Sequence, residues 1–119
     1  MEMQMKELGK QWITSEKEYR EGEVFVYRQK FTASQVKKAV FYGTALGVYE
    51  AELNGVKIGR QMFAPGFSYY PRRVLYQTHE VTELLREGEN TLTVYLGQGW
   101  YCGRFLCENQ TQIYGEQPA

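Results

Sequence analysis

The residues best suited to binding chemistry lie in an aromatic segment, Gly97-Gln98-Gly99-Trp100-Tyr101. A tryptophan and a tyrosine after two glycines could offer a flat apolar surface to the C–H face of a sugar ring, with the Gln98 amide as a hydrogen-bond partner. The same segment also fits a structural role, in which Trp100 fills the core of a small β-sandwich and the glycines permit a bulge. The sequence leaves both interpretations open.

A second segment, residues 67–73, gathers aromatic and cationic side chains in one predicted loop, namely Tyr69, Tyr70, Arg72 and Arg73. It could contact a glycan, or it could pack its own rings and leave the arginines solvated. Aromatic and basic residues also combine in sites for single-stranded nucleic acid. However, the chain carries 14 Lys+Arg and 14 Asp+Glu, a net charge of zero. We therefore expect no nucleic-acid partner, because binding to the phosphate backbone depends on an excess of Lys and Arg.

The spacing of the acidic residues does not indicate catalysis. Glycoside hydrolysis needs two carboxylates that face each other across the scissile bond. Glu50 and Glu52 instead share one face of a predicted strand, and Glu87 and Glu89 flank a glycine. We interpret these acids as solvated charges and expect no catalytic residue in this chain.

The remaining reactive side chains are few: Cys102, Cys107 and a single histidine, His79. They provide no complete metal-ligand set and no local signature of a cysteine nucleophile. The two cysteines could close a short disulfide, but no secretory signal is visible, so we expect reduced thiols and a cytoplasmic location. No apolar run reaches the ~18 residues of a membrane span, so we expect no membrane association.

Short strands must position these residues, because aromatic and β-branched residues alternate with Gly and Asn turns. The length of 119 residues corresponds to a single domain, residues 1–119. Strands are predicted at residues 23–31, 36–44, 47–53, 74–81 and 90–96, with a helical turn at 82–86 that Thr82 could cap. The pattern predicts an all-β fold, an antiparallel β-sandwich or jelly roll.

Two of these strands predict which side chains face the core. In residues 47–53, Tyr49, Ala51 and Leu53 share one face. Asn54-Gly55 follows, a strong hairpin signal because both residues tolerate a positive φ. In residues 90–96, alternation turns one set of side chains toward the core (Leu92, Val94 and Leu96) and the other outward (Thr91, Thr93 and Tyr95).

Several segments, taken in order, resemble the N-terminal β-sandwich domain of bacterial α-L-rhamnosidases. The resemblance spans about residues 12–119 and rests on the ordered set rather than on any single motif. Its segments are residues 45–50, 53–55, 64–67, Tyr70, 72–78, 81–82, Leu85, 88–90 and 97–101.

This resemblance implies a galactose-binding-like jelly-roll accessory module that precedes the (α/α)-barrel catalytic domain of a multidomain glycoside hydrolase. It implies a part in recognising rhamnose-containing glycans, with the parent's catalytic domain as a partner. The family module is longer than this chain, so we expect an N-terminal fragment that lacks C-terminal strands. An unpaired sheet edge would then favour a homo-oligomer.

The resemblance also implies calcium, which some relatives use to bind rhamnose. This sequence has Tyr69 where relatives often carry an acidic residue, and Glu80 where they often carry Asp. Calcium needs several oxygen ligands, carboxylates among them. With one candidate carboxylate lost, we expect no cofactor.

Three hypotheses follow. The first is a non-catalytic carbohydrate-recognition domain, and the second is a structural brace or dimerisation module without a ligand. The third and weakest is a freestanding hydrolase. Exposure of Trp100 and Tyr101 distinguishes the first two. The candidate carbohydrate-binding residues are Asn54, Tyr69, Tyr70, Arg72, Arg73, Trp100 and Tyr101.

Overall fold

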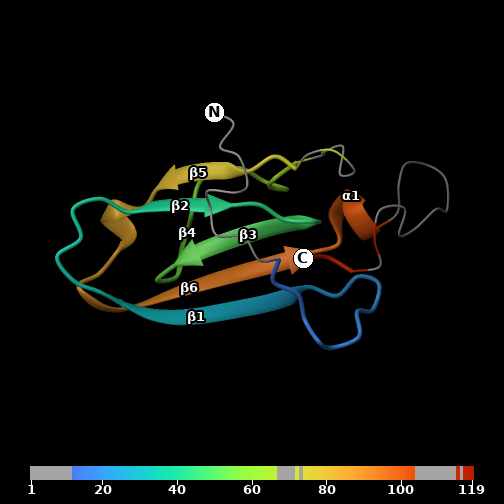
Figure 1. The fold of residues 1–119 in the computed structure, drawn as a ribbon, viewed down its shortest axis with the longest axis horizontal. Helices are drawn as coiled ribbons and strands as arrows, with labels where there is room; N and C mark the ends of the chain where they lie inside the picture. The colour runs from blue at the N-terminus through green and yellow to red at the C-terminus, as the bar shows by residue number, and fades with distance from the viewer. Residues whose placement is uncertain (1–11, 67–71, 73, 104–114, 116) are drawn as a thin grey trace.

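A computed structural model describes residues 12–66, 72, 74–103, 115 and 117–119. Two antiparallel sheets form its body (Figure 1). The larger sheet has the order β1-β6-β3-β4, and the smaller pairs β2 with β5. Their bounds are β1 Phe25–Ala33, β2 Val40–Gly43, β3 Val48–Leu53, β4 Val56–Lys57, β5 Gln77–Glu80 and β6 Gly88–Gly97.

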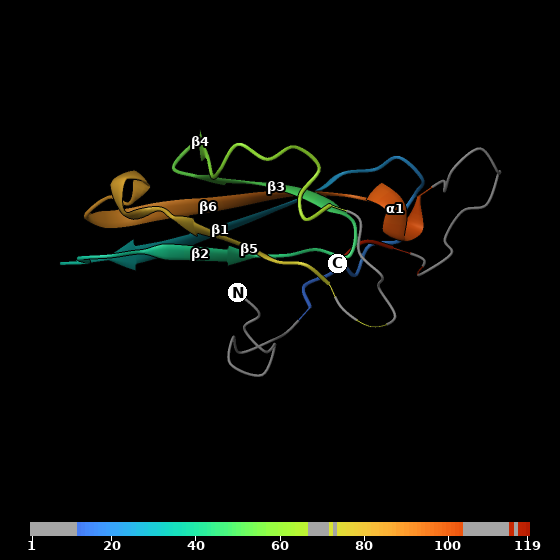
Figure 2. The ribbon, with the colours of Figure 1, turned by 90° about the horizontal axis from the view of Figure 1, so that it is seen from above.

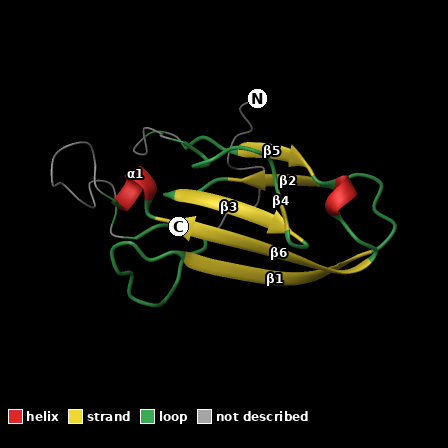
Figure 3. Cartoon of the chain, turned by 180° about the vertical axis from the view of Figure 1, so that it is seen from behind, coloured by secondary structure: helices red, strands yellow, loops and turns green. Residues whose placement is uncertain are grey.

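The two sheets lie as separate layers when the molecule is seen edge-on (Figure 2). Among the residues that the structure describes, helix is confined to two single turns, η2 (Thr82–Leu84) and α1 (Gly99–Cys102), as the colouring of Figure 3 shows. The all-β, antiparallel sandwich predicted from the sequence is therefore confirmed. No helix in the described part of the chain is long and apolar enough to cross a membrane.

The core lies between the sheets and follows strand alternation. One cluster includes the buried Ala51 and Leu53 of β3. Partly buried side chains pack against it, among them Phe41 of β2 and Leu92 and Val94 of β6. A second cluster, toward the other end of the sandwich, is built on Phe25, Ala45 and Leu96. The predicted core faces of residues 47–53 and 90–96 are thus confirmed.

The outward face of β6 differs from its prediction at Thr93, which is only 7% exposed. Thr93 lies between Arg28 of β1 and Glu52 of β3 in the register of the sheet. Long charged side chains can lay their aliphatic stems along a sheet surface, so these two neighbours offer a physical reason for the burial of the short threonine. The side chain faces outward, as predicted, and is buried there by its neighbours.

The Asn54-Gly55 hairpin is confirmed. Asn54 has a φ of 53° and Gly55 a φ of 81°, the positive values that a tight two-residue turn between β3 and β4 needs.

Two predictions for the chain around β2 were wrong. The strand expected at residues 36–44 begins only at Val40. Glu87 accepts hydrogen bonds from the Ser34 hydroxyl (2.8 Å) and the Gln35 N–H (3.1 Å), which hold the preceding chain in a turn. Thr82 does not cap the helical turn; its hydroxyl accepts the Ala39 N–H at 3.0 Å, which ties η2 to the start of β2.

Candidate functional site

Two exposed aromatic rings, Phe63 and Trp100, meet at the α1 end of the sandwich. We call them the aromatic pair. Their centroids lie 6.5 Å apart at an interplanar angle of 65°, an edge-to-face contact. Phe63 is 64% exposed and Trp100 36%, and Met62 beside them is 72% exposed. Trp100 belongs to neither core cluster. The interpretation of Trp100 as a core plug was therefore wrong.

The backbone holds Phe63 in an unusual conformation. Its φ of 55° lies in the left-handed region, which bulky side chains rarely adopt. Such a conformation costs ~1–3 kcal/mol and persists only where the surroundings impose it. Here the Gly66 N–H bonds to the Phe63 carbonyl at 2.8 Å, and the Tyr49 N–H of β3 bonds to the Ala64 carbonyl at 2.7 Å. Core packing does not explain this strain, because the ring points to solvent.

A half-buried polar relay supports the same loop. The Tyr49 hydroxyl donates to the Gln77 Oε1 at 2.7 Å, and the Gln77 Nε2 donates to the Pro65 carbonyl at 3.3 Å. Burial raises the pKa of Tyr49 to about 12, so the hydroxyl stays protonated and keeps its donor role at neutral pH. The relay connects β3 and β5 to the loop that carries Phe63.

Trp100 is positioned by the glycine before it. Gly99 has a φ of 51°, and a Cβ there would lie 2.8 Å from Val48 Cγ1. Only glycine fits this approach of α1 to the start of β3. The glycines thus permit a helical turn rather than the expected bulge.

Gln98 has a different task from the sugar contact considered for it. Its Oε1 accepts the Tyr19 hydroxyl at 2.7 Å and the Gly22 N–H at 3.2 Å. The side chain therefore fixes the turn before β1 to the start of α1.

Tyr101 contacts the C-terminal part of the described chain. Its ring packs against Gly115, where no Cβ could be accommodated. The next residue, Cys102, is a buried free cysteine, and burial raises the pKa of its thiol to about 11. Little thiolate is then present at neutral pH, which makes Cys102 inert as a nucleophile. Cys107 lies outside the described residues.

Of the predicted aromatic-cationic loop, only Arg72 is described, and it is exposed in a turn. Tyr69, Tyr70 and Arg73 lie outside the described residues.

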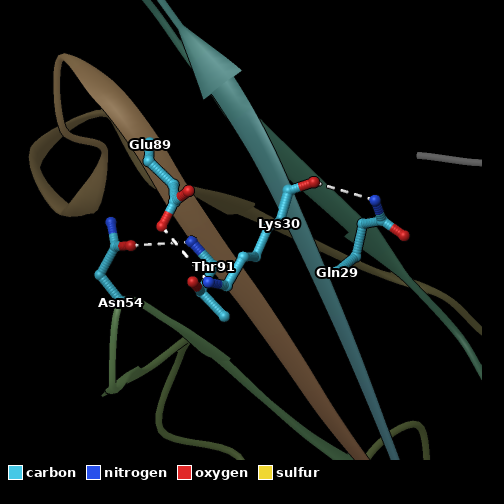
Figure 4. A network of polar contacts seen from close by, with 5 residues as sticks. All are labelled: Gln29, Lys30, Asn54, Glu89 and Thr91. Carbon is cyan, nitrogen blue, oxygen red and sulfur yellow. Dashed lines mark hydrogen bonds and ion pairs between the residues drawn. The ribbon is translucent and has the colours of Figure 1, made fainter.

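Asn54 lies at the opposite end of β3 from Trp100 (Figure 1). Its Nδ2 donates to the Leu84 carbonyl and to Asn90 Oδ1, both at 2.8 Å. Its Oδ1 accepts the Thr91 N–H at 2.9 Å, as Figure 4 shows beside the Lys30–Glu89 ion pair. Because both amide protons are used within the protein, Asn54 has a structural role in this arrangement.

The acidic side chains are dispersed. Glu50 pairs with Lys57 at 3.1 Å, and Glu89 pairs with Lys30 at 3.5 Å. No three Cys, His, Asp or Glu side chains gather at one point in the parts of the chain that the structure describes. Those residues do not form the carboxylate-rich set that a calcium ion requires.

Sequence reasoning missed Phe63 and Met62. A weak signal existed, since two large apolar residues stand in a loop bounded by Gly59 and Gly66. Their exposure could not be derived from it, because it depends on the left-handed backbone at Phe63.

Fold and site together define a β-sandwich domain with a strained, exposed aromatic contact surface and no assembled catalytic group among its described residues. Comparison with known proteins gives the family. The model of the α-L-rhamnosidase N-terminal domain matches residues 34–119. The chain belongs to this family. β1, which precedes the matched range, pairs along its whole length with β6 and so completes the same sheet.

Individual relatives agree with this assignment. An α-L-rhamnosidase of Streptomyces avermitilis is 48% identical over 85 residues, which cover 71% of this chain and 8% of that protein. One from Alteromonas is 37% identical over 78 residues, covering 65% of this chain and 8% of that protein. The chain thus spans about 8% of the length of the curated relatives that it matches.

Solved structures agree as well. The crystal structure of an Aspergillus terreus α-L-rhamnosidase matches with a TM-score of 0.77 and 37% identity, over 80% of this chain and 11% of that one. The Streptomyces avermitilis α-L-rhamnosidase complexed with L-rhamnose matches with a TM-score of 0.74 and 43% identity, over 78% of this chain and 9% of that one.

Proposed function

We propose that this chain is a non-catalytic accessory domain of an α-L-rhamnosidase-like glycoside hydrolase, and that it contributes to recognition of rhamnose-containing glycans through the aromatic pair. Family membership supports the first part. One observation carries the second: an exposed phenylalanine is held in a left-handed conformation, edge-on to an exposed tryptophan. Backbone strain that packing does not explain is concentrated at functional sites in proteins.

The geometry of the pair suits a single sugar ring. An aromatic face attracts the C–H face of a pyranose, and the second ring at 65° supplies a side wall. Rhamnose is a 6-deoxy sugar, so its methyl group adds apolar surface that the wall can contact. The site is open rather than enclosed, so we expect weak binding, with a dissociation constant of roughly 1 mM.

Intrinsic fluorescence tests this proposal. The chain has two tryptophans, so Trp12→Phe leaves Trp100 as the only one. We expect this variant to bind a rhamnose-containing oligosaccharide with a saturable change in emission, since Trp12 lies outside the pair. Phe63→Gly should weaken binding at least about tenfold, because it removes the side wall. The unfolding free energy should change by no more than about 1 kcal/mol, because glycine relieves the strain at this exposed position.

Two outcomes would contradict the proposal: emission that does not respond to the oligosaccharide, or unchanged affinity in Phe63→Gly. Urea unfolding of each variant is the control, because it separates lost contacts from lost structure.

A second candidate function is a brace that docks on the catalytic domain of the parent protein. The exposed side chain of Met62 beside the pair favours it, since an apolar surface of this kind also suits a protein partner. The brace predicts no sugar response in the fluorescence experiment.

The catalytic acids of the proposed hydrolase would then belong to another part of the parent. An aryl α-L-rhamnoside assay of the isolated chain should give no release above background. Measurable turnover would favour the freestanding hydrolase instead.

A further inference from the structure

The turn between β3 and β4 contains the one asparagine that a glycine follows in this sequence. Asparagines stand at positions 54, 90 and 109, and only Asn54 precedes a glycine. A glycine has no side chain beside its backbone nitrogen, so that nitrogen can closely approach the side-chain amide carbon of the asparagine before it. Gly55 is also open in the fold, since an added Cβ would have no atom within 4 Å. Attack of the backbone on a side chain is therefore sterically easiest at this dipeptide.

The reaction open to Asn54 and Gly55 is loss of ammonia followed by addition of water. The Gly55 nitrogen attacks Cγ of Asn54, the new N–Cγ bond closes a five-membered succinimide, and the Cγ–Nδ2 bond breaks. The proton of the Gly55 N–H leaves with Nδ2 as ammonia. Water then opens the ring. Cleavage of the N–Cγ bond yields aspartate, whereas cleavage of the bond from the Asn54 carbonyl carbon to the Gly55 nitrogen yields isoaspartate.

The fold restrains the Asn54 side chain against this reaction. Its Nδ2, the leaving group, donates to the Leu84 carbonyl and to Asn90 Oδ1, both at 2.8 Å. Its Oδ1 accepts the Thr91 N–H at 2.9 Å (Figure 4). Attack at Cγ moves Oδ1 and expels Nδ2, so these hydrogen bonds must break first. They break together when this end of the sandwich opens, locally or globally.

Neither product can restore the arrangement. Aspartate has no amide N–H groups, so its carboxylate would face the Leu84 carbonyl and Asn90 Oδ1, which are both acceptors. Asn90 cannot turn its amide round to compensate. Its Oδ1 accepts the Arg86 N–H at 2.7 Å, and its Nδ2 donates to the Arg86 and Gly88 carbonyls at 2.8 Å and 3.0 Å. Isoaspartate adds one carbon atom to the backbone of the two-residue turn, which shifts the register of β3 with β4.

We propose that Asn54 is a site of spontaneous deamidation that the native fold protects. The reaction proceeds from the opened state, and its products destabilise the closed state. A reversible opening of this end of the sandwich is thereby converted into a permanent loss of the asparagine network, because an opened chain that is chemically modified does not return to the native state. This inference concerns the end of β3 opposite the aromatic pair and is independent of the proposed function.

The sequence allows the products to be detected without background. It contains no aspartate, so every aspartate or isoaspartate in the chain arises from an asparagine. Peptide mass spectrometry and enzymatic methylation of isoaspartate follow the reaction at mildly alkaline pH, in buffer and in concentrated urea. We expect Asn54 to react at least about tenfold faster in urea, where the protecting hydrogen bonds are absent. Asn90, which a threonine follows, is the internal control and should react far more slowly than Asn54 in urea.

Three variants locate the protection in the network. Asn90→Ala removes an acceptor of Asn54 Nδ2, so Asn54 in this variant should react at least about fivefold faster in buffer than in the wild type. Gln29→Ala changes an exposed amide and is the matched control, so it should react at the wild-type rate. Asn54→Asp reproduces one product and should unfold at a urea midpoint about 1 M lower.

Equal rates in buffer and in urea would overturn the proposal, because the fold would then give no protection. An unchanged rate in Asn90→Ala or a wild-type urea midpoint in Asn54→Asp would overturn it as well. Circular dichroism establishes whether Asn90→Ala is folded. Should it be unfolded, a series of urea concentrations below the wild-type midpoint decides instead: the rate at Asn54 should rise with urea, and a constant rate rejects the opened-state route.

Discussion

At the scale of single residues, two asparagines stabilise the end of the sandwich opposite the aromatic pair. Asn90 is 1% exposed, and its side chain makes four hydrogen bonds, with the Arg86 N–H and carbonyl, the Gly88 carbonyl and Asn54. Buried polar groups are costly unless paired, so this complete satisfaction indicates a structural site. It also explains why Asn54, a candidate sugar contact in the sequence, is committed to the fold.

Replacement of Asn90 by alanine should lower the free energy of unfolding by about 2–4 kcal/mol, because it leaves the Arg86 N–H and the Asn54 amide without their partner. Urea denaturation monitored by circular dichroism measures this loss. Gln29→Ala is the control: this amide is exposed and bonds only to the neighbouring Lys30 carbonyl at 2.9 Å. The control should stay within about 0.5 kcal/mol of the wild type. An equal loss of unfolding free energy in both variants would contradict the structural role of Asn90.

Tyr49 predicts how stability depends on alkaline pH. Its pKa is raised from 10.0 to about 12 in the folded chain, so the unfolded chain loses this proton first. Unfolding free energy is therefore unaffected by Tyr49 below pH ~10 and falls as pH rises from ~10 to ~12. Tyr49→Phe should have a shallower decline over this window in urea titrations at fixed pH. Tyr42→Phe, on an exposed ring, should decline as the wild type does; identical slopes in all three proteins would contradict the prediction.

At the scale of elements, glycines set how closely segments approach. Gly99 brings α1 against β3, whereas Gly55 sits in the β3–β4 turn with no atom within 4 Å of an added Cβ. Both have a positive φ, 51° and 81° respectively. Alanine at Gly55 therefore tests the free-energy cost of the left-handed backbone alone. Alanine at Gly99 adds the cost of a steric contact.

Gly55→Ala should lower the unfolding free energy by about 1 kcal/mol, the cost of a left-handed alanine. Gly99→Ala should cost about 2 kcal/mol more, because its Cβ also meets Val48 and displaces α1. Thermal and urea unfolding compare the two, and emission of Trp100 in the Trp12→Phe background reports the displacement. An equal loss of unfolding free energy in the two variants would show that contact with β3 does not position α1.

The local sequence was enough to predict features that depend only on neighbouring residues. The Asn54-Gly55 turn follows from the tolerance of both residues for positive φ, and the core face of β3 follows from alternation alone. The late start of β2 depends on Glu87, more than fifty residues from Ser34, which no local pattern contains. Burial of Thr93 likewise depends on neighbours supplied by two other strands.

At the scale of the whole molecule, the sandwich and its family could be predicted from the sequence, but the candidate site only in part. Trp100 was identified, yet its partner Phe63 was not, because a left-handed backbone and an exposed ring arise from contacts among β3, β5 and a loop. Gln98 and Asn54 have polar side chains of the right type, but tertiary contacts engage their hydrogen-bonding groups. Residue type indicates which side chains could hydrogen-bond to a sugar. Only the fold shows which of those groups already bond within the protein.

Contact between the aromatic pair and a rhamnose-containing glycan is tested most directly by an amide NMR titration of the 119-residue chain with L-rhamnose, with and without calcium. We expect saturable shifts confined to the neighbourhood of Phe63 and Trp100, with Trp12 and the Asn54–Asn90 network unmoved and no requirement for calcium. A spectrum that stays unchanged at high millimolar sugar in both conditions would contradict the claim and favour the brace.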